Sequence, residues 1–209
     1  MHILFEGLDL AGKSTVCRRF AQQAAGTWAI RRNAMAKENR VQAFADELRK
    51  ADALEDEALG WLYLAALRAD IALLAQEPQD VGNIVQDSTI LVRSLAHHTA
   101  RNRTHLAEEF RSLKDLLPRF DHVFLCVADR DTRLRRLQKR RKTELSPEDF
   151  LVRDDYGRFQ QMEQLVADFI TGELGGTLID TSGLENEERL SMVFRHAPHL
   201  ERTSDAGTA

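Results

Sequence analysis

Short apolar runs alternate along the chain with longer segments in which apolar residues recur every three or four positions. The short runs, three to six residues long and bounded by Gly, Pro, Asp or Asn, predict five strands, at Ile3–Phe5, Thr27–Ile30, Asn83–Gln86, His122–Val127 and Thr177–Ile179. The longer segments predict helices over residues 13–25, 37–50, 54–76, 89–98, 103–116, 131–141, 148–171 and 185–195. Strands separated by helices pair in parallel through right-handed crossovers. We therefore expect an α/β fold, a three-layer α/β/α sandwich around a five-stranded parallel sheet.

The chain is expected to form one domain over residues 1–209, ending in a polar tail at about 202–209. It contains no internal repeat and no linker rich in Pro, Gly or Ser. A chain of this length can bury one substantial core.

The segment Gly7–Ser14 matches the phosphate-binding pattern G-x-x-x-x-G-K-[ST], between a predicted strand and a predicted helix. Glycines at both ends let successive backbone N–H groups turn toward a phosphate, and the start of the following helix adds its positive end. We expect Lys13 to act on the β- and γ-phosphates of ATP and Ser14 to hold Mg²⁺. The expected nucleotide-binding residues are Gly7, Leu8, Asp9, Leu10, Ala11, Gly12, Lys13, Ser14 and Thr15. The pattern arises by chance in roughly 1% of chains of this length, before the strand and helix are required.

The net charge and its distribution along the chain indicate which kinds of ligand the protein binds. The net charge of −4 argues against binding of a nucleic-acid polymer, although residues 130–142 carry eight cations and one carboxylate. Such a run is usually a solvated helix face. Here the phosphate loop lacks an arginine of its own, so Arg136 and Arg140, one helical turn apart, are candidates for the cation that stabilises the transition state. We expect them on a lid at about 136–149.

The longest apolar stretch and the two cysteines lead us to expect a cytoplasmic protein without a membrane-spanning segment. The longest apolar stretch, residues 60–75, is interrupted by charges and too short to span a bilayer. Cys17 and Cys126 fall in a predicted helix and a predicted strand and are expected to be small buried side chains.

The loop Phe5–Thr15 resembles that of thymidylate kinases, F-E-G-x-D-G-x-G-K-S-T. Further resemblances follow in the same order along nearly the whole chain: Leu62–Ala69 to the L-L-F-x-A-x-R-A helix, Val85–Asp87 with Ser94–His97 to D-R-Y…S-L-A-Y-Q, and Arg133–Arg140 to the arginine-rich lid. The resemblance implies a P-loop fold of the nucleotide kinase type, ATP and Mg²⁺ as co-substrate and cofactor, and a possible homodimer. No guanine-binding N/T-K-x-D motif and no L-S-G-G-Q signature is present.

The departures from this resemblance fall on the acceptor side. The family's R-E-P is Arg31–Asn33 here, its phosphate-gripping arginine is Ser88, its base-stacking Phe is Leu64 and its Tyr-Gln pair is His97–His98. Thymidylate is therefore expected to be a poor acceptor, unless Arg31, Arg32 or Arg93 reaches the phosphate. The residues that we expect to bind the acceptor are Arg31, Trp61, Leu64, Arg68, Arg93 and His97.

Several of these residues also have structural interpretations. Asp87 ends a strand beside the loop and is expected to hold Mg²⁺ or its water, with a helix cap as the alternative. Asp9 is expected to contact the acceptor or position its nucleophile, or else to stabilise a turn. Arg68 is expected to bind the acceptor, or to pair with Asp70 or a carboxylate of a neighbouring helix. Trp61 is expected to stack on a planar acceptor or to pack in the core.

The function that these residues support is ATP- and Mg²⁺-dependent transfer of a phosphoryl group to a nucleoside monophosphate or a related small molecule. Lys13, Asp9, Arg136 and Arg140 are the expected catalytic residues. One alternative is a kinase of nucleoside or small-molecule hydroxyl groups, for which Asp9 or Asp87 would be the base. Another is a nucleotide-binding switch that hydrolyses ATP weakly or not at all.

Overall fold

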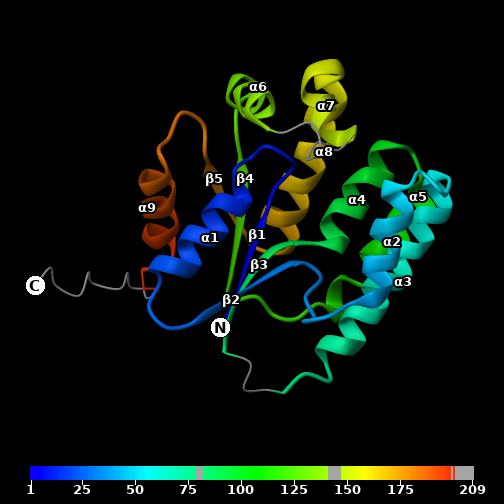
Figure 1. Ribbon diagram of the computed structural model, residues 1–209, viewed down its shortest axis with the longest axis horizontal. Helices are drawn as coiled ribbons and strands as arrows, with labels where there is room; N and C mark the ends of the chain where they lie inside the picture. Colours follow the sequence, from blue (N-terminus) through cyan, green and yellow to red (C-terminus); the bar gives the residue numbers. More distant parts are fainter. Residues whose placement is uncertain (79–81, 141–146, 199, 201–209) are drawn as a thin grey trace, which may run out of the picture.

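A computed structural model describes residues 1–78, 82–140, 147–198 and 200. Its centre is a parallel sheet of five strands in the order β2 (Trp28–Asn33), β3 (Asn83–Thr89), β1 (His2–Glu6), β4 (His122–Val127) and β5 (Thr177–Asp180), as Figure 1 shows. The three central strands are almost entirely buried because helices cover both faces of the sheet. The predicted five-stranded parallel sheet is confirmed.

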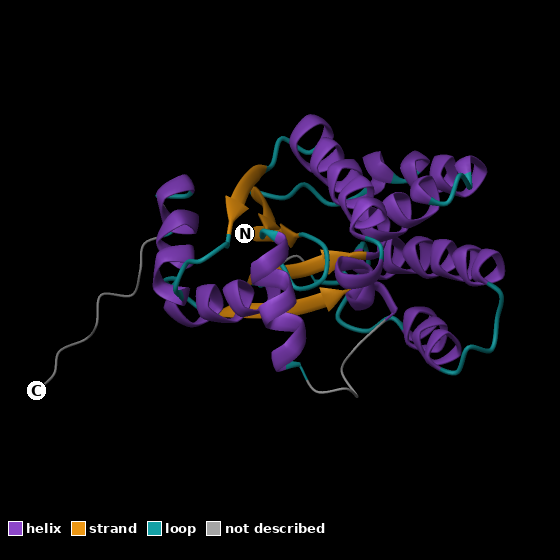
Figure 2. Cartoon of the chain, turned by 90° about the horizontal axis from the view of Figure 1, so that it is seen from above, coloured by secondary structure: helices purple, strands orange, loops and turns teal. Residues whose placement is uncertain are grey.

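Helices lie on both faces of the sheet (Figure 2), and each face has a core of its own. On one face, α1 (Lys13–Gln23) and α9 (Asn186–His196) pack on a cluster that includes Phe5, Phe20 and Phe124. The other face carries four further helices of the described chain, which pack on Leu4 and Leu125 of the sheet among others. They are α3 (Asp56–Leu74), α4 (Ile90–Ala100), α5 (Thr104–Ser112) and α8 (Tyr156–Asp168), with α2 (Arg40–Lys50) packed on α3.

Two predicted helices end differently in the structure. The single helix expected over residues 148–171 is divided into α7 (Pro147–Asp154), α8 and a π-helical turn, η3 (Phe169–Glu173). The division falls at Asp155, whose carboxylate accepts a hydrogen bond from the backbone N–H of Arg158 at 3.1 Å and so caps α8. The basic helix α6 (Arg130–Lys139) ends before Arg140, whose backbone is extended. A short 3₁₀ turn, η1 (Lys114–Leu116), follows α5.

The topology brings three segments together at the carboxyl edge of the sheet. Phe5 of β1 pairs with Asp87 of β3 and with Phe124 of β4, so the loops that leave these strands start side by side. In open α/β sheets, ligands bind at this edge, where neighbouring strands connect in opposite directions. No helix within the described residues is both long and apolar enough to cross a membrane.

Candidate active site

The loop between β1 and α1 has a backbone that only particular residues fit. Gly7 has φ 142°, and a Cβ there would lie 2.3 Å from the carbonyl oxygen of Cys126. Gly12, with φ 84°, immediately precedes α1. Leu10 also has a positive φ, 65°, at the position where the family's loop has glycine. The loop therefore takes the conformation expected of a phosphate cradle at a helix N-terminus.

Lys13 and Asp87 face each other at the base of this loop. Lys13 Nζ lies 3.4 Å from Asp87 Oδ1, and the Asp87 side chain is 5% exposed. Asp87 Oδ1 accepts no hydrogen bond from the residues that the structure describes. Ser14 lies in the first turn of α1, one residue beyond Lys13. Carboxylate and hydroxyl oxygens are ligands that a hard divalent cation accepts, so the chemistry of Asp87 and Ser14 fits a Mg²⁺ site.

Glu6 and Ser88 hold β1 and β3 together below the loop. The buried Glu6 carboxylate accepts hydrogen bonds from Ser88 Oγ at 2.7 Å, from Thr89 N at 2.6 Å and from Thr89 Oγ1 at 2.8 Å. Burial raises the pKa of Glu6, against the opposing effects of Lys13 and these hydrogen bonds. Ser88 stands at the position where the resemblance to thymidylate kinases would place an arginine that grips the acceptor phosphate. Its hydroxyl already donates a hydrogen bond to Glu6.

Two of the arginines of α6, Arg133 and Arg136, contact the phosphate loop, whereas Arg130 and Arg135 of the same helix are exposed. Arg133 is fully buried; it donates to the Asp9 carbonyl, pairs with Glu163 and stacks over Phe159 with 4.7 Å to the ring centroid. Arg136 donates to the Leu10 carbonyl at 2.7 Å and to the Thr181 carbonyl at 3.0 Å. Its guanidinium thus contacts the loop itself, and its expected role as the cation that stabilises the transition state stays a prediction.

Arg140 departs from the expected arrangement in another way. Because α6 ends at Lys139, Arg140 does not share a helical face with Arg136. Its guanidinium pairs with the buried Asp149 at 2.7 Å. Burial raises the pKa of Asp9, and among the cations that lower it Arg93 and Lys13 come first, with Arg140 acting in the same direction. The centre of the lid expected at about 136–149 lies outside the described residues.

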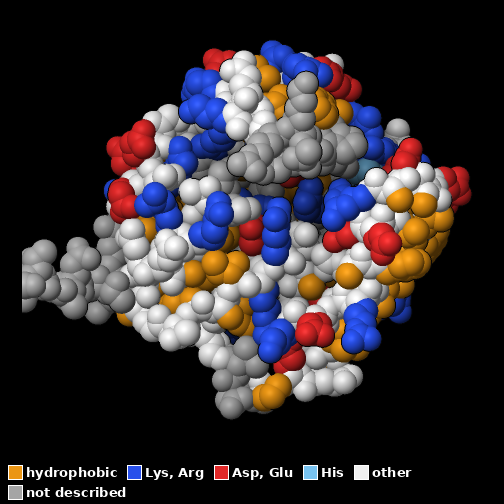
Figure 3. Space-filling view, in the orientation of Figure 1, with side chains coloured by type: hydrophobic (Ala, Val, Ile, Leu, Met, Phe, Trp, Pro, Cys, Tyr) orange, Lys and Arg blue, Asp and Glu red, His pale blue; other side chains and the backbone are white. Residues whose placement is uncertain are grey.

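A cavity of about 400 Å³ opens next to the loop, between α2, α3, α4 and α8. Figure 3 shows lysine and arginine side chains gathered around the middle of this face of the molecule. The cavity is lined by Leu8, Asp9, Asn33, Gln42, Asp46, Arg49, Asp52, Leu54, Glu55, Asp56, Leu59, Gly60, Tyr63, Thr89, Ile90, Arg93, Ser94, His97, His98, Arg101, Leu151, Phe159 and Met162. Its size is that of sites for small ligands.

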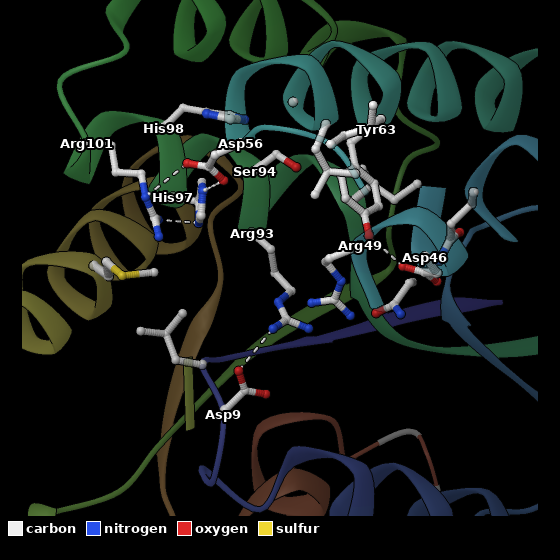
Figure 4. Close-up of a pocket in the computed structure, with 18 of the residues that line it drawn as sticks. Asp9, Asp46, Arg49, Asp56, Tyr63, Arg93, Ser94, His97, His98 and Arg101 are labelled. Carbon is white, nitrogen blue, oxygen red and sulfur yellow. Dashed lines mark hydrogen bonds and ion pairs between the residues drawn. The ribbon is translucent and has the colours of Figure 1, made fainter. Parts of the chain in front are cut away.

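The end of the cavity nearest the loop is cationic (Figure 4). Arg93 pairs with Asp9 at 3.0 Å, and the guanidinium of Arg49 lies beside that of Arg93. Burial raises the pKa of Asp9, but Arg93, Lys13, Arg140 and Arg49 lower it by more, so that the net shift is downward. Asp9 is therefore ionised and a weak base.

The far end of the cavity contains a network built on Asp56. Its carboxylate contacts His97 Nε2 at 3.0 Å, Arg101 Nε at 3.1 Å and Arg103 at 2.5 Å. Burial raises the pKa of Asp56, while these neighbours, His97 foremost, bring it below its usual value. His98 is buried beside this network, and its pKa is lowered to about 4 by burial and by His97, so its ring is neutral.

Of the six residues predicted to bind the acceptor, the structure brings Arg93 and His97 to the cavity. Arg31 lies away from it and pairs with Glu77 at 2.5 Å. Leu64 is a core residue, and Trp61 is 44% exposed beside His105. Arg68 is exposed and lies 3.8 Å from Glu109 of α5, the neighbouring-helix partner considered as its alternative.

The rotation of α3 explains these differences. The helix turns Asp56, Leu59, Gly60 and Tyr63 toward the cavity, and this face does not include 61, 64 or 68. The resemblance placed an aromatic residue at position 64, which is Leu64 here. In the structure the aromatic side chain that lines the cavity is that of Tyr63, one residue earlier. Helix α3 approaches α4 closely at Gly60. A Cβ at this position would lie 2.6 Å from His98 Cε1, so that a larger residue would not fit.

Sequence reasoning missed the contribution of α2 altogether. Gln42, Asp46 and Arg49 all line the cavity. Their i, i+4, i+7 spacing places them on one helical face, a signal that was present in the sequence but that any polar helix surface shares.

One protein family matches most of the chain. The sequence model of the family described as thymidylate kinase matches residues 5–171. No curated protein is similar enough in sequence to be matched.

Similar solved structures include three kinases. The thymidylate kinase of Candida albicans has a TM-score of 0.68 and 19% identity, with 98% of this chain and 95% of that chain covered. The thymidylate kinase of Ehrlichia chaffeensis has a TM-score of 0.61 and 13% identity, covering 95% and 98%. A deoxyadenosine kinase from M. mycoides, solved with bound dATP, has a TM-score of 0.59 and 16% identity, covering 95% and 100%.

Proposed function

The chain belongs to the thymidylate kinase family and is a P-loop phosphotransferase, and on that premise we propose that it transfers the γ-phosphate of ATP, in the presence of Mg²⁺, to the phosphate of a nucleotide-sized acceptor. The observation that carries this proposal is the pair of arginines, Arg49 and Arg93, in the cavity beside the phosphate loop. Two guanidinium groups facing one point of a cavity suit an anion such as a phosphate.

The nucleotide side of the proposal rests on the loop. Gly7, Gly12 and the start of α1 provide backbone N–H groups for the phosphates of ATP, and Lys13 provides a positive charge. Ser14 and Asp87 would hold Mg²⁺, which when bound neutralises charge on the transferred phosphoryl group. Arg136 keeps the loop in position through the Leu10 carbonyl. We assign to Arg140 the task of supplying positive charge near Asp9.

The acceptor side favours a phosphate over a hydroxyl group as nucleophile. A hydroxyl acceptor needs a base, and the ionised, arginine-paired Asp9 has a lowered pKa that makes it a weak one. A phosphate acceptor is already ionised at neutral pH and needs only to be held and aligned. Asp9 then positions Arg93, and Arg93 with Arg49 holds the acceptor.

The proposal is tested by measuring ADP formation from ATP and Mg²⁺ with a panel of nucleoside monophosphates, nucleosides and no acceptor. We expect turnover that depends on a nucleoside monophosphate and is abolished by chelation of the metal. Turnover with nucleosides alone would indicate a hydroxyl kinase. ADP formation that is unchanged by every member of the panel would indicate a nucleotide-binding switch, and either result would overturn the proposal.

A further inference from the structure

Arg133 of α6 is a buried charge that the proposed chemistry does not use. It has the largest side chain among the fully buried residues of the described chain. Burial lowers its pKa, and the neighbouring Glu163 raises it by less, so that the net shift is downward. Apolar residues of similar volume often stabilise a core as well as a buried ion pair does, so stability alone does not explain this arginine.

The guanidinium of Arg133 joins three segments of the chain. Its Nε donates a hydrogen bond to the carbonyl oxygen of Ala128, directly after β4, at 2.8 Å. One terminal nitrogen donates to the carbonyl of Asp9 in the phosphate loop, and the other pairs with Glu163 of α8. The ring of Phe159, also on α8, has its centroid 4.7 Å from the guanidinium carbon. Because the guanidinium is planar and rigid, it holds these partners at set distances from one another.

Two of these partners are walls of the cavity beside the loop. Asp9 lines the cavity from the loop, and Phe159 lines it from α8. The Asp9 carboxylate pairs with Arg93 at 3.0 Å (Figure 4), while the Asp9 backbone is held by Arg133. Arg133 therefore sets where the α8 wall stands relative to the residue that holds Arg93.

Helix α8 has its own apolar anchor. Phe159, Met162 and Val166 are buried in the core on that face of the sheet, and α8 packs on α4. Without the ion pair between Arg133 and Glu163, α8 should therefore stay attached to the molecule. What it would lose is its fixed distance from the phosphate loop.

Three successive carbonyl groups of the loop accept hydrogen bonds from side chains of other segments. The donors are Arg133 for Asp9, Arg136 for Leu10 and Thr181 Oγ1 for Ala11. Of these three loop residues, Asp9 is the one that lines the cavity. The bond from Arg133 thus belongs to the acceptor side, and the other two bonds would still hold the loop for ATP.

We propose that Arg133 is a positioning residue for the acceptor, because it fixes Asp9, and through Asp9 also Arg93, at a set distance from the α8 wall. This inference rests on the proposed function, since it needs the acceptor phosphate to lie at Arg93. A misplacement of reacting groups by a fraction of a bond length lowers the rate of transfer without removing any group that touches the nucleotide. Arg133 therefore acts on the acceptor and on kcat, and not on the binding of the adenine nucleotide.

The kinetic test removes both buried charges at once, in the double variant Arg133→Met with Glu163→Met. We expect kcat/KM for the nucleoside monophosphate with the highest turnover to fall at least about tenfold. The dissociation constant of ADP, measured by calorimetry, should stay within about threefold. The midpoint of urea unfolding should be close to that of the unaltered chain, because no charge is left buried and unpaired.

Two further variants separate positioning from a structural role. Arg133→Lys keeps a charge beside Glu163, but a single ammonium group cannot reach all three partners, so it should show the same loss for the acceptor. Arg135→Met is the matched control, since Arg135 is an exposed residue of the same helix that bonds to Thr132 within it, and it should change neither constant. Full rescue of acceptor turnover by Arg133→Lys would overturn the inference. So would equal losses for ADP and for the acceptor.

Hydrogen exchange separates this inference from the proposed function, because it needs no turnover. In the double variant and in Arg133→Lys, the backbone amides of residues 8–12 and 156–163 should exchange at least about tenfold faster, while those of the sheet stay unchanged. If the catalytic panel fails while this local change holds, the proposed function is wrong and Arg133 still positions the loop against α8. If neither segment changes, the inference is wrong whatever the panel shows.

Discussion

At the scale of single residues, Lys13 is the side chain that links the phosphate loop to the end of β3. Its ammonium group lies 3.4 Å from Asp87, at the point where the loop turns into α1. It is the only lysine within the loop, and the charge that it contributes counts most when negative charge builds up on the transferred phosphoryl group.

We therefore expect Lys13→Ala to lower kcat by at least about a hundredfold while the chain stays folded. The measurement is steady-state ADP formation, with far-ultraviolet circular dichroism as the control for folding. Turnover near that of the unaltered chain would remove the loop from the mechanism.

Arg93 gives a second prediction at this scale. Arg93→Met keeps much of the side-chain volume but removes the guanidinium that pairs with Asp9 and lines the cavity proposed for the acceptor. Losing a hydrogen bond to a charged group should raise the KM for the acceptor roughly ten- to hundredfold. The KM for ATP should change far less. Equal changes in both constants would show that Arg93 supports the loop and not the acceptor.

The residues that the sequence identified well are those that lie next to one another in it. The loop Gly7–Ser14 is contiguous, and its glycines and lysine are required by local backbone geometry. The cavity residues come from different helices, and which side chains face inward depends on how each helix is rotated. A rotation that the sequence does not encode locally put Tyr63 in the cavity and Leu64 in the core.

At the scale of elements, α6 connects the loop to the rest of the molecule. Arg133 and Arg136 both donate to carbonyl groups of the loop, while Arg140, beyond the end of the helix, pairs with Asp149. Among the described arginines of the basic run, Arg133 and Arg136 thus hold the loop, while Arg140 contributes to the lowered pKa of Asp9 after burial, Arg93 and Lys13.

This division predicts different effects for two substitutions. Arg136→Ala should raise the KM for ATP as well as lower kcat, because the loop loses its bonds to Arg136. Arg140→Ala should lower kcat by at least about tenfold with little effect on the KM for ATP, because it removes charge that acts mainly in the transition state. Kinetics with ATP varied at saturating acceptor distinguish the two. Identical effects would contradict the division.

The boundaries of elements were predicted well where a continuous apolar run decides them, and less well where a single side-chain hydrogen bond decides them. His122–Val127 was predicted residue for residue, since its continuous apolar run suits a strand buried on both faces. The predicted helix over 148–171 is interrupted at Asp155, because that carboxylate caps α8 and competes with continuation of α7.

At the scale of the whole molecule, buried histidines link stability to pH. Burial, with the charge of His97, lowers the pKa of His98 from 6.5 to about 4. Burial, with Arg31, does the same to His2. Between these values the unfolded chain binds protons that the folded chain does not, so stability should fall as the pH falls from 6.5 to 4.

We expect His98→Phe to make this fall less steep, because phenylalanine cannot bind a proton and can retain the stacking on Phe110. The contribution of His2 should remain. Urea unfolding at several pH values measures the slope. A slope that is the same in the variant and the unaltered chain would show that His98 does not contribute to it.

The central claim is that the cavity beside the phosphate loop holds an acceptor phosphate that receives the γ-phosphate of ATP. Phosphorus NMR of the protein with ATP, Mg²⁺ and the nucleoside monophosphate that gives the highest turnover tests it directly, because each possible product has its own resonances. The account predicts ADP together with the diphosphate of the acceptor, in equal amounts and without free phosphate. ADP accompanied only by inorganic phosphate, or a mixture that stays unchanged, would contradict it.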